Sequence, residues 1–457
     1  MLPISRTFAI MSVIEKKAEL EAYFHDAGKT RDRWRVGTEY EKVGIDRNTG
    51  KAIPYFGRRG VEFILRELID RFGWQPEEQN GHIIALMRDK AQITLEPGGQ
   101  IELSGEPCES IHCTEGEFTQ HIRELLEVAD PLDIVFLGLG MQPISRLEEI
   151  EWVPKKRYAI MGPYMPKVGT LGQRMMKQTA TVQTNIDFLD EKDAMAKFRT
   201  GMGLAPVLVA MFANSPICDG QVNGYRSFRE HIWTDTDKSR AGLLKFAFSP
   251  DVGFAHYVEY ALDVPMYFII RHHDYIDMTG ITFRQFLQSG HNGERATLED
   301  WNDHLTTLFP ETRIKRYIEV RSADSQPPEL MPALSALIKG AFYDADCLQA
   351  AWDLVKDWSW DERMQVYLDS HKDALAARFR RYALLDLAKE LLQIAWEGLR
   401  RQKALNSQGD DETIYLDPLK KLLSQGKCPA DVLLEKWHGE LERDLKKLIA
   451  YSAYKLP

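Results

Sequence analysis

The sequence predicts an α+β fold, in which a mostly antiparallel sheet is joined by helices that accumulate toward the C-terminus. Segments of alternating polarity, which are typical of half-buried strands, recur between residues 34 and 322. Helical periodicity dominates beyond about residue 340, and strands and helices do not alternate as in a parallel βαβ fold. We therefore expect a core over residues 1–345 and a C-terminal helical region over 346–457 that packs on it, the two forming one structural domain.

The first half of the chain contains clear local signals. Residues 15–28 and 60–73 are predicted helices, because apolar side chains gather on one face and each segment ends at a glycine. Residues 34–46 are predicted to form a strand. Residues 92–104 favour two strands around Pro97-Gly98-Gly99, since proline followed by glycine suits a type II turn. Residues 150–180 show no clear period and predict a long ordered loop.

The second half is predicted to become progressively helical. We expect strands at 181–188, 263–270 and 316–322, helices at 192–213, 371–403, 417–426 and 429–450, and a linker at 406–412. The helix at 371–403 is predicted because apolar residues recur there at spacings of three and four.

Composition excludes several classes of protein. The chain has 457 residues, a formal net charge of −10 and a pI near 5.7, whereas a nucleic-acid-binding surface needs clustered positive charge. Its longest uncharged apolar stretch, residues 201–213, is shorter than the roughly 20 residues that span a bilayer. The N-terminal stretch lacks a small-residue cleavage site, so no signal peptide is expected. These features predict a cytoplasmic protein without nucleic-acid or membrane partners.

Four strand-like segments place polar residues two apart, so that each pair points to one face of its strand. The pairs are Glu39 and Glu41, Gln100 and Glu102, Gln183 and Asn185, and Glu319 and Arg321, with Glu96 just before the predicted turn. Any one of these pairs could lie on the solvent-exposed face of an antiparallel sheet without a further role. Five glutamates with few lysines indicate more than a solvated face if the four strands share one sheet.

Carboxylates that lie close together repel each other unless a cation lies between them. Oxygen ligands without HExxH or a Cys/His spacing favour Mg²⁺ over zinc, and Mg²⁺ in turn suggests nucleotide phosphates. Neither a P-loop nor a GxGxxG turn is present. Phosphate charge would then be met by scattered cations such as Lys167, Arg229, Arg240 and Arg284, although each is more often a surface charge.

Long motifs resemble the plant-type family of glutamate–cysteine ligases, which also occurs in bacteria. They include RVGTEYEK (35–42), TLEPGGQIELSGEP (94–107), YMPKVGTLG (164–172), TATVQTNIDF (179–188), HIWTDTDKSRAG (231–242) and the segment 303–324. The resemblance covers roughly residues 30–345. It implies a curved antiparallel sheet with helices outside and an active site of the glutamine synthetase kind.

The resemblance also implies a reaction and the residues that serve it. ATP would phosphorylate the side-chain carboxylate of glutamate, and the cysteine amine would displace phosphate to give γ-glutamylcysteine, the first step of glutathione biosynthesis. The implied metal ligands for two or three Mg²⁺ ions are Glu39, Glu41, Glu96, Glu102 and Glu319. The implied substrate contacts are Arg229, Gln183, Asn185, Thr170 and Tyr164, with Arg229 and Arg321 as catalytic residues; those for ATP are Lys167, Arg240, Arg284 and Arg321.

Two alternatives remain open at this point. A ligase of the same mechanism could join glutamate to another small amine, and a regulator could bind metal and nucleotide without turnover. Feedback inhibition by glutathione is a further expectation that the family raises.

The cysteines depart from the plant pattern. Plant members carry regulatory disulfides, but Glu115, Met278 and Pro332 stand at or beside expected cysteine positions. We therefore predict no redox switch of that kind. The five cysteines, Cys108, Cys113, Cys218, Cys347 and Cys428, are interpreted as structural or free thiols, and a disulfide scaffold is not expected.

Overall fold

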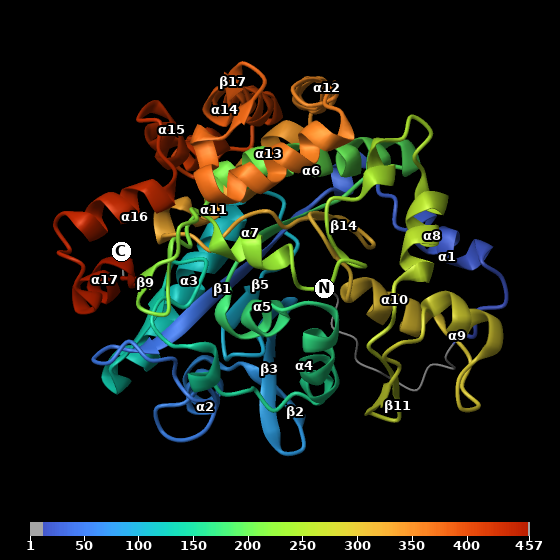
Figure 1. The fold of residues 1–457 in the computed structure, drawn as a ribbon, viewed down its shortest axis with the longest axis horizontal. Coiled ribbons are helices and arrows are strands. Elements are labelled where there is room, and N and C mark those ends of the chain that lie inside the picture. Colours follow the sequence, from blue (N-terminus) through green and yellow to red (C-terminus); the bar gives the residue numbers. More distant parts are fainter. Residues whose placement is uncertain (1–11, 456–457) are drawn as a thin grey trace.

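The computed structural model describes residues 12–455, and its centre is an open antiparallel sheet (Figure 1). The strand order is β14-β15-β7-β1-β5-β4-β3-β2, and β6 pairs with the far half of β1. The strands are β1 (Val36–Asp46), β2 (Gln75–Gln79), β3 (His82–Arg88), β4 (Ala91–Leu95), β5 (Ile101–Ser104), β6 (Ile134–Leu137), β7 (Val182–Ile186), β14 (Thr312–Ile314) and β15 (Ile318–Val320). The predicted α+β class with a mostly antiparallel sheet is confirmed.

Helices surround this sheet. They are α1 (Ala18–His25), α2 (Val61–Phe72), α3 (Ile111–Ala129), α4 (Lys156–Val168), α5 (Gly172–Gln178), α6 (Glu191–Phe212), α7 (Phe228–Trp233), α8 (Phe254–Asp263), α9 (Phe283–Ser289), α10 (Leu298–Thr306), α11 (Met331–Phe342), α12 (Ala345–Asp353), α13 (Trp360–Asp373), α14 (Leu384–Gln402), α15 (Asp417–Ser424), α16 (Pro429–His438) and α17 (Leu445–Ser452). Short hairpins and bridges complete the fold: β8 (Ile217–Cys218), β9 (Gln221–Val222), β10 (Ala241–Gly242), β11 (Phe268–Arg271), β12 (Asp274–Asp277), β13 (Phe309–Pro310), β16 (Arg378–Phe379) and β17 (Tyr382–Ala383).

One face of the sheet is closed by α3 and α11. On β1 the buried ring of Tyr40 lies 4.7 Å from that of Phe118 on α3. The hydroxyl of Thr38 lies 2.9 Å from that of Ser335 on α11. Because side chains alternate along a strand, packing Tyr40 and Thr38 on this side directs Glu39 and Glu41 to the other face.

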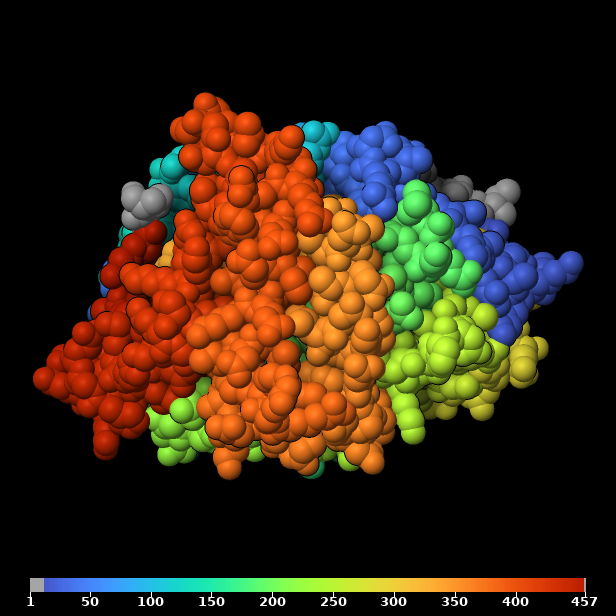
Figure 2. Space-filling view, turned by 90° about the horizontal axis from the view of Figure 1, so that it is seen from above, coloured from blue at the N-terminus to red at the C-terminus, as the bar shows by residue number. Residues whose placement is uncertain are grey.

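The C-terminal helices pack directly on the core. Helices α12 and α13 lie against α6, and α14 lies against α11. Residues coloured orange to red cover the left and centre of the face seen in Figure 2. At the crossing of α11 and α14 the backbones approach closely, since a Cβ on Gly398 would lie 1.9 Å from the carbonyl oxygen of Gly340. Only glycine fits at this crossing.

Three sequence predictions on secondary structure are wrong. Residues 150–180 are largely helical, as α4 and α5; Tyr158, Met161 and Met165 form the buried side of α4, a period obscured by two prolines inside the helix. The single helix expected over 371–403 is interrupted after Asp373, where Ala374 adopts positive φ, and by the β16–β17 hairpin, in which Arg380 does so. The helix expected over 429–450 divides into α16 and α17 for the same backbone reason, at residues 442 and 443.

Among residues 12–455, no helix combines the length and the apolar character that a membrane span requires. The N-terminal stretch on which the absence of a signal peptide was predicted includes residues 1–11, which lie outside the described part of the chain.

Candidate active site

The sheet register brings the predicted polar pairs side by side. Glu41 on β1 stands opposite Glu102 on β5, and Glu39 stands opposite Gln183 on β7. Asn185 on β7 stands opposite Glu319 on β15. The four strands therefore share one sheet, which was the condition for a common polar face. We call this side of the sheet the carboxylate face, defined by Glu39, Glu41, Glu96, Glu102, Gln183, Asn185, Glu319 and Arg321.

A cluster of carboxylates lies at the β1–β5 end of this face. One oxygen each of Glu41, Glu96 and Glu102 lies within 4.8 Å of the others. Glu96 comes from the β4–β5 turn, in which the Gly99 N–H donates to the Glu96 carbonyl. The expected type II turn is wrong, because the positive φ falls on Gly99 (+85°) and not on Gly98. Hard oxygen donors at this spacing suit a divalent cation such as Mg²⁺.

The positive charge near this cluster does not balance its carboxylates. Burial, together with the neighbouring Glu96 and Glu102, raises the pKa of Glu41 well above its usual value, and Arg229 only partly opposes this. Burial, together with Glu39 and Glu96, raises the pKa of Glu102 to about 8. The ionised form of such carboxyls is unfavourable without a cation, and a bound cation would stabilise it. The donor set therefore fits a metal ion.

Glu319 differs from this cluster. It is fully buried, and its carboxylate forms ion pairs with Arg313, Lys315 and Arg321. Burial alone would raise the pKa of Glu319, but these three cations outweigh burial and hold the pKa well below its usual value. In this structure Glu319 holds cationic side chains in place, and a role as a metal ligand stays a prediction.

Polar contacts continue across the centre of the face. The amide of Asn185 donates to Glu39 Oε1 at 3.0 Å. Arg321 Nη1 donates both to Gln183 Oε1 and to Glu319 Oε1. These contacts connect the carboxylates of β1 with the cations of β14 and β15, so that negative and positive side chains lie on one surface.

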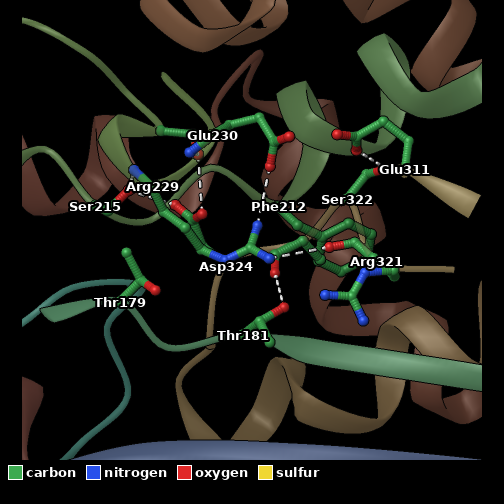
Figure 3. A network of polar contacts seen from close by, with 12 residues as sticks. Thr179, Thr181, Phe212, Ser215, Arg229, Glu230, Glu311, Arg321, Ser322 and Asp324 are labelled. Atoms are coloured by element: carbon green, nitrogen blue, oxygen red, sulfur yellow. Dashed lines mark hydrogen bonds and ion pairs between the residues drawn. The ribbon is translucent and has the colours of Figure 1, made fainter. Parts of the chain in front are cut away.

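Arg229 is placed at this face by α7. Its Nη1 donates to Glu230 Oε2 at 2.9 Å and its Nη2 donates to the carbonyl oxygen of Arg321 at 3.3 Å. Figure 3 shows the guanidinium between the Glu230 carboxyl and the main chain of Arg321. Its charge acts on Glu41, since it lowers the pKa of that carboxyl. Arg229 thus lies beside the carboxylate cluster.

A buried aspartate fixes the backbone around Arg229. Asp324 accepts hydrogen bonds from the Asn214 N–H and the Ser215 hydroxyl, both at 2.7 Å, and from the Ser227 hydroxyl at 2.9 Å. The Ser215 hydroxyl oxygen in turn accepts from the Arg229 N–H at 3.0 Å. The end of α6, the start of α7 and the segment after β15 are therefore held together.

Four other predicted contacts lie on or near the segments around α4 and α7. Tyr164 is buried, and its ring packs on Tyr267 with centroids 5.4 Å apart. The hydroxyl of exposed Thr170 donates to Asp235. Arg240 is fully buried, and its guanidinium is occupied by Asp237 and the carbonyls of Thr307 and Pro265. Lys167 is exposed and makes no hydrogen bond or ion pair within residues 12–455.

Arg284 is the predicted site residue that the structure does not bring to the carboxylate face, and its contact with ATP stays a prediction. It lies on α9, toward the side of the molecule away from β1 and β5 (Figure 1). Its guanidinium pairs with Asp263 and Glu259 of α8. This arginine therefore links two surface helices and does not join the carboxylate face.

The cysteine prediction also needs correction. Cys108 and Cys113 form a disulfide, with their Cα atoms 5.8 Å apart. It joins the segment after β5 to the first turn of α3, a pairing that sequence spacing alone did not single out. Cys218, Cys347 and Cys428 are free and buried, in agreement with structural thiols.

Sequence reasoning missed a cavity beside the cluster. It has a volume of about 540 Å³, and its lining includes Trp152, Lys155 and Tyr158. The Lys155 ammonium donates to the Leu95 carbonyl at 2.8 Å, next to Glu96. Burial lowers the pKa of Lys155 to about 8, although the Glu96 carboxylate opposes this. The aromatic and basic residues around 152–158 could have indicated this cavity. Because the segment was predicted to be a loop, there was no reason to expect their side chains on one side.

The fold and site define a protein with an open antiparallel sheet whose carboxylate face can hold a divalent cation next to arginines. Residues 35–447 match the family described as glutamate-cysteine ligase family 2. The chain belongs to this family.

Relatives agree with this membership, and a solved structure has a similar fold. The chain is 45% identical over 427 residues to the chloroplastic glutamate–cysteine ligase of Arabidopsis thaliana, covering 93% of this chain and 80% of that protein. It is 43% identical over 432 residues to that of Medicago truncatula, covering 94% and 83%. The fold is similar to a crystal structure of glutamate–cysteine ligase from Francisella tularensis in complex with AMP (TM-score 0.54, 14% identity, 93% and 90% covered).

Proposed function

We propose that this protein joins the γ-carboxylate of L-glutamate to the amine of L-cysteine at the expense of ATP, forming γ-glutamylcysteine, ADP and phosphate. The observation that carries the proposal is the cluster of Glu41, Glu96 and Glu102 on one sheet face, with Arg229 of α7 near enough to lower the pKa of Glu41. Carboxylates that need a cation and an arginine that can pair with a carboxylate are what a phosphoryl transfer to glutamate requires. The family membership supports this choice over other metal-dependent reactions.

Glu41, Glu96 and Glu102 would hold Mg²⁺, with Glu39 the nearest further candidate. When bound, Mg²⁺ neutralises and orients the phosphate oxygens of ATP. The raised pKa values of Glu41 and Glu102 support this assignment, because the cluster lacks a positive charge in its own side chains. The number of ions, and the ligand role of Glu319, are part of the proposal.

The side chains divide the remaining work. Arg229 pairs bidentately with a carboxylate of glutamate and so fixes the substrate with its γ-carboxylate toward the carboxylate face. Arg321, held by Gln183 and Glu319, stabilises negative charge on the phosphoryl group as it moves. Asn185, which donates to Glu39, keeps that carboxylate oriented.

The reaction proceeds in two displacements. The γ-carboxylate oxygen of glutamate attacks the γ-phosphorus of ATP, the bond to the bridging oxygen breaks, and ADP leaves. The cysteine nitrogen then attacks the acyl carbon, phosphate leaves, and the amine loses a proton. An acyl phosphate hydrolyses readily, so side chains that exclude water from the buried face preserve it.

The cavity lined by Trp152, Lys155 and Tyr158 is where we place the nucleoside part of ATP. Its volume of about 540 Å³ lies within the roughly 300–1,000 Å³ common for small-molecule sites. Trp152 offers a ring for stacking on a purine, and Lys155 offers a positive charge between the cavity and Glu96.

Isotope transfer tests the chemistry. Glutamate labelled with oxygen-18 in its γ-carboxylate is incubated with ATP, Mg²⁺ and cysteine, and the released phosphate is analysed by mass spectrometry. One labelled oxygen per phosphate is expected, because the acyl phosphate carries that oxygen to phosphorus. Unlabelled phosphate would overturn the two-step reaction. Replacing cysteine by 2-aminobutyrate or another small amine tests the acceptor; faster turnover with one of these would favour the alternative ligase.

The plant relatives are named as chloroplastic proteins, and a cytoplasmic location for this chain stays a prediction.

A further inference from the structure

A tyrosine of the C-terminal helical region reaches the residues around Arg229. Tyr367 lies on α13 and is buried. Its hydroxyl oxygen lies 3.0 Å from Glu230 Oε1 and 2.7 Å from Glu311 Oε1. Glu230 follows Arg229 on α7, and Glu311 directly precedes β14. One hydroxyl therefore joins three segments that are far apart in the sequence.

The Tyr367 hydroxyl contacts two carboxyl groups but carries only one proton. A phenol carries one proton and can donate one hydrogen bond, so both contacts form only when one carboxyl is protonated and donates to the phenol oxygen. Burial, followed by the neighbouring Glu311, raises the pKa of Glu230 well above its usual value. A protonated Glu230 still accepts from Arg229 Nη1 through its other oxygen, at 2.9 Å. The Arg229 guanidinium is then held by a neutral carboxyl, and its positive charge is left for the carboxylate of the substrate.

The same helix also supports the backbone that leads into α7. The carbonyl oxygen of His371, one turn after Tyr367, accepts hydrogen bonds from the Arg226 N–H at 3.0 Å and the Ser227 N–H at 2.9 Å. Glu311 is fixed in turn, since its Oε2 accepts from the Ser322 hydroxyl at 2.6 Å (Figure 3). Helix α13 thus contacts both the start of α7 and the side chain that holds Arg229.

We propose that Tyr367 is a positioning residue for Arg229, acting through Glu230, and that the C-terminal helical region in this way sets the affinity for the carboxylate substrate. The inference rests on the proposed function, in which Arg229 binds a carboxylate of glutamate. Tyr367 does not need to touch any substrate for this role.

The test compares two tyrosine variants that each lose one buried hydroxyl. Tyr367→Phe removes the contacts with Glu230 and Glu311. Tyr55→Phe is the matched control, because its buried hydroxyl donates to the Ile83 carbonyl at 2.7 Å and has no contact with α7. We expect Tyr367→Phe to raise the KM for glutamate about 3- to 10-fold, as for the loss of one buried hydrogen bond. The KM for ATP should not change, and Tyr55→Phe should alter neither KM.

A double variant separates the possible failures. If Tyr367 acts through Arg229, Tyr367→Phe should raise the glutamate KM much less in an Arg229→Lys background than in the natural chain. Independent, fully additive effects would overturn the positioning role, as would a Tyr367→Phe enzyme that matches Tyr55→Phe in both KM values. If Arg229→Lys itself leaves the glutamate KM unchanged, the proposed function of Arg229 is wrong instead. A Tyr367→Phe chain that does not fold is replaced in the same assays by Glu311→Gln, which keeps the tyrosine and changes its partner.

Discussion

Replacing Glu102 with glutamine removes one ionisable carboxyl from the cluster of Glu41, Glu96 and Glu102. Burial, with Glu39 and Glu96 nearby, raises the pKa of Glu102 from 4.5 to about 8. Because one pKa unit corresponds to about 1.4 kcal/mol, ionising Glu102 in the metal-free fold costs several kcal/mol. An amide of the same shape removes this cost. For a chain of this length, one kcal/mol shifts Tm by about 1 °C.

The pH dependence follows from the sign of that change. The folded-state pKa lies above the unfolded one, so the contribution of Glu102 to stability is present below about pH 4.5 and is lost as the pH rises through about 8. Without metal, the Glu102→Gln chain should therefore melt about 2–4 °C above the natural chain at pH 8.5. At pH 4.5 the two should melt together.

Differential scanning fluorimetry at several pH values, with EDTA or with Mg²⁺, measures both effects. Mg²⁺ should raise the Tm of the natural chain at pH 8.5 and that of Glu102→Gln much less, and turnover of the variant should fall more than about 100-fold. Glu117→Gln is the matched control, because burial raises the pKa of Glu117 to about 7 on α3. It should shift the pH profile of Tm but leave turnover and the Mg²⁺ response intact. Normal turnover of Glu102→Gln, with an undiminished Mg²⁺ response, would refute the metal assignment.

Three further outcomes are expected. Arg229→Lys should raise the glutamate KM about 10-fold and leave the ATP KM unchanged, because a lysine cannot form the bidentate pair. An equal rise in the ATP KM would assign this residue to phosphate, and Arg284→Lys, which changes an arginine between two surface helices, is the control. Gly398→Ala should lower the free energy of unfolding by about 2 kcal/mol or more in urea titration, since its Cβ would meet a backbone oxygen of α11 at 1.9 Å; unchanged stability would contradict this close approach. Dithiothreitol should not change turnover with 2-aminobutyrate, because the Cys108–Cys113 bond closes only a short loop; a several-fold change that Cys113→Ser abolishes would reveal a redox switch.

The carboxylate face was predictable because strand periodicity is strict. Once Glu39 and Glu41 lie on a strand, they must share a face, and burial of Tyr40 determines which face remains for them. The position of the turn at Pro97-Gly98-Gly99 was predictable from its proline and glycines, but its type was not, since Gly99 and not Gly98 takes positive φ. Local rules of this kind do not depend on the rest of the chain.

Contacts between distant segments were not predictable in this way. The contact of Arg321 with Gln183, 138 residues away in the sequence, comes from the pairing of β15 with β7, which no local pattern specifies. Tyr367 fits the apolar side of a helix, and nothing in its neighbourhood along the chain indicates that its hydroxyl meets two glutamates. Arg284 was an implied ATP contact, and nothing in its own segment indicates that it pairs with Asp263 and Glu259 on α8.

The reaction proposed for the carboxylate face can be tested directly through its products. The decisive measurement is the joint quantification of ADP and γ-glutamylcysteine from ATP, glutamate and cysteine, by coupled assay and mass spectrometry, with Mg²⁺ and with EDTA. We predict equal amounts of ADP and γ-glutamylcysteine with Mg²⁺, and neither product with EDTA. ADP release without the dipeptide, or dipeptide formation that is unaffected by removal of the metal, would contradict the account.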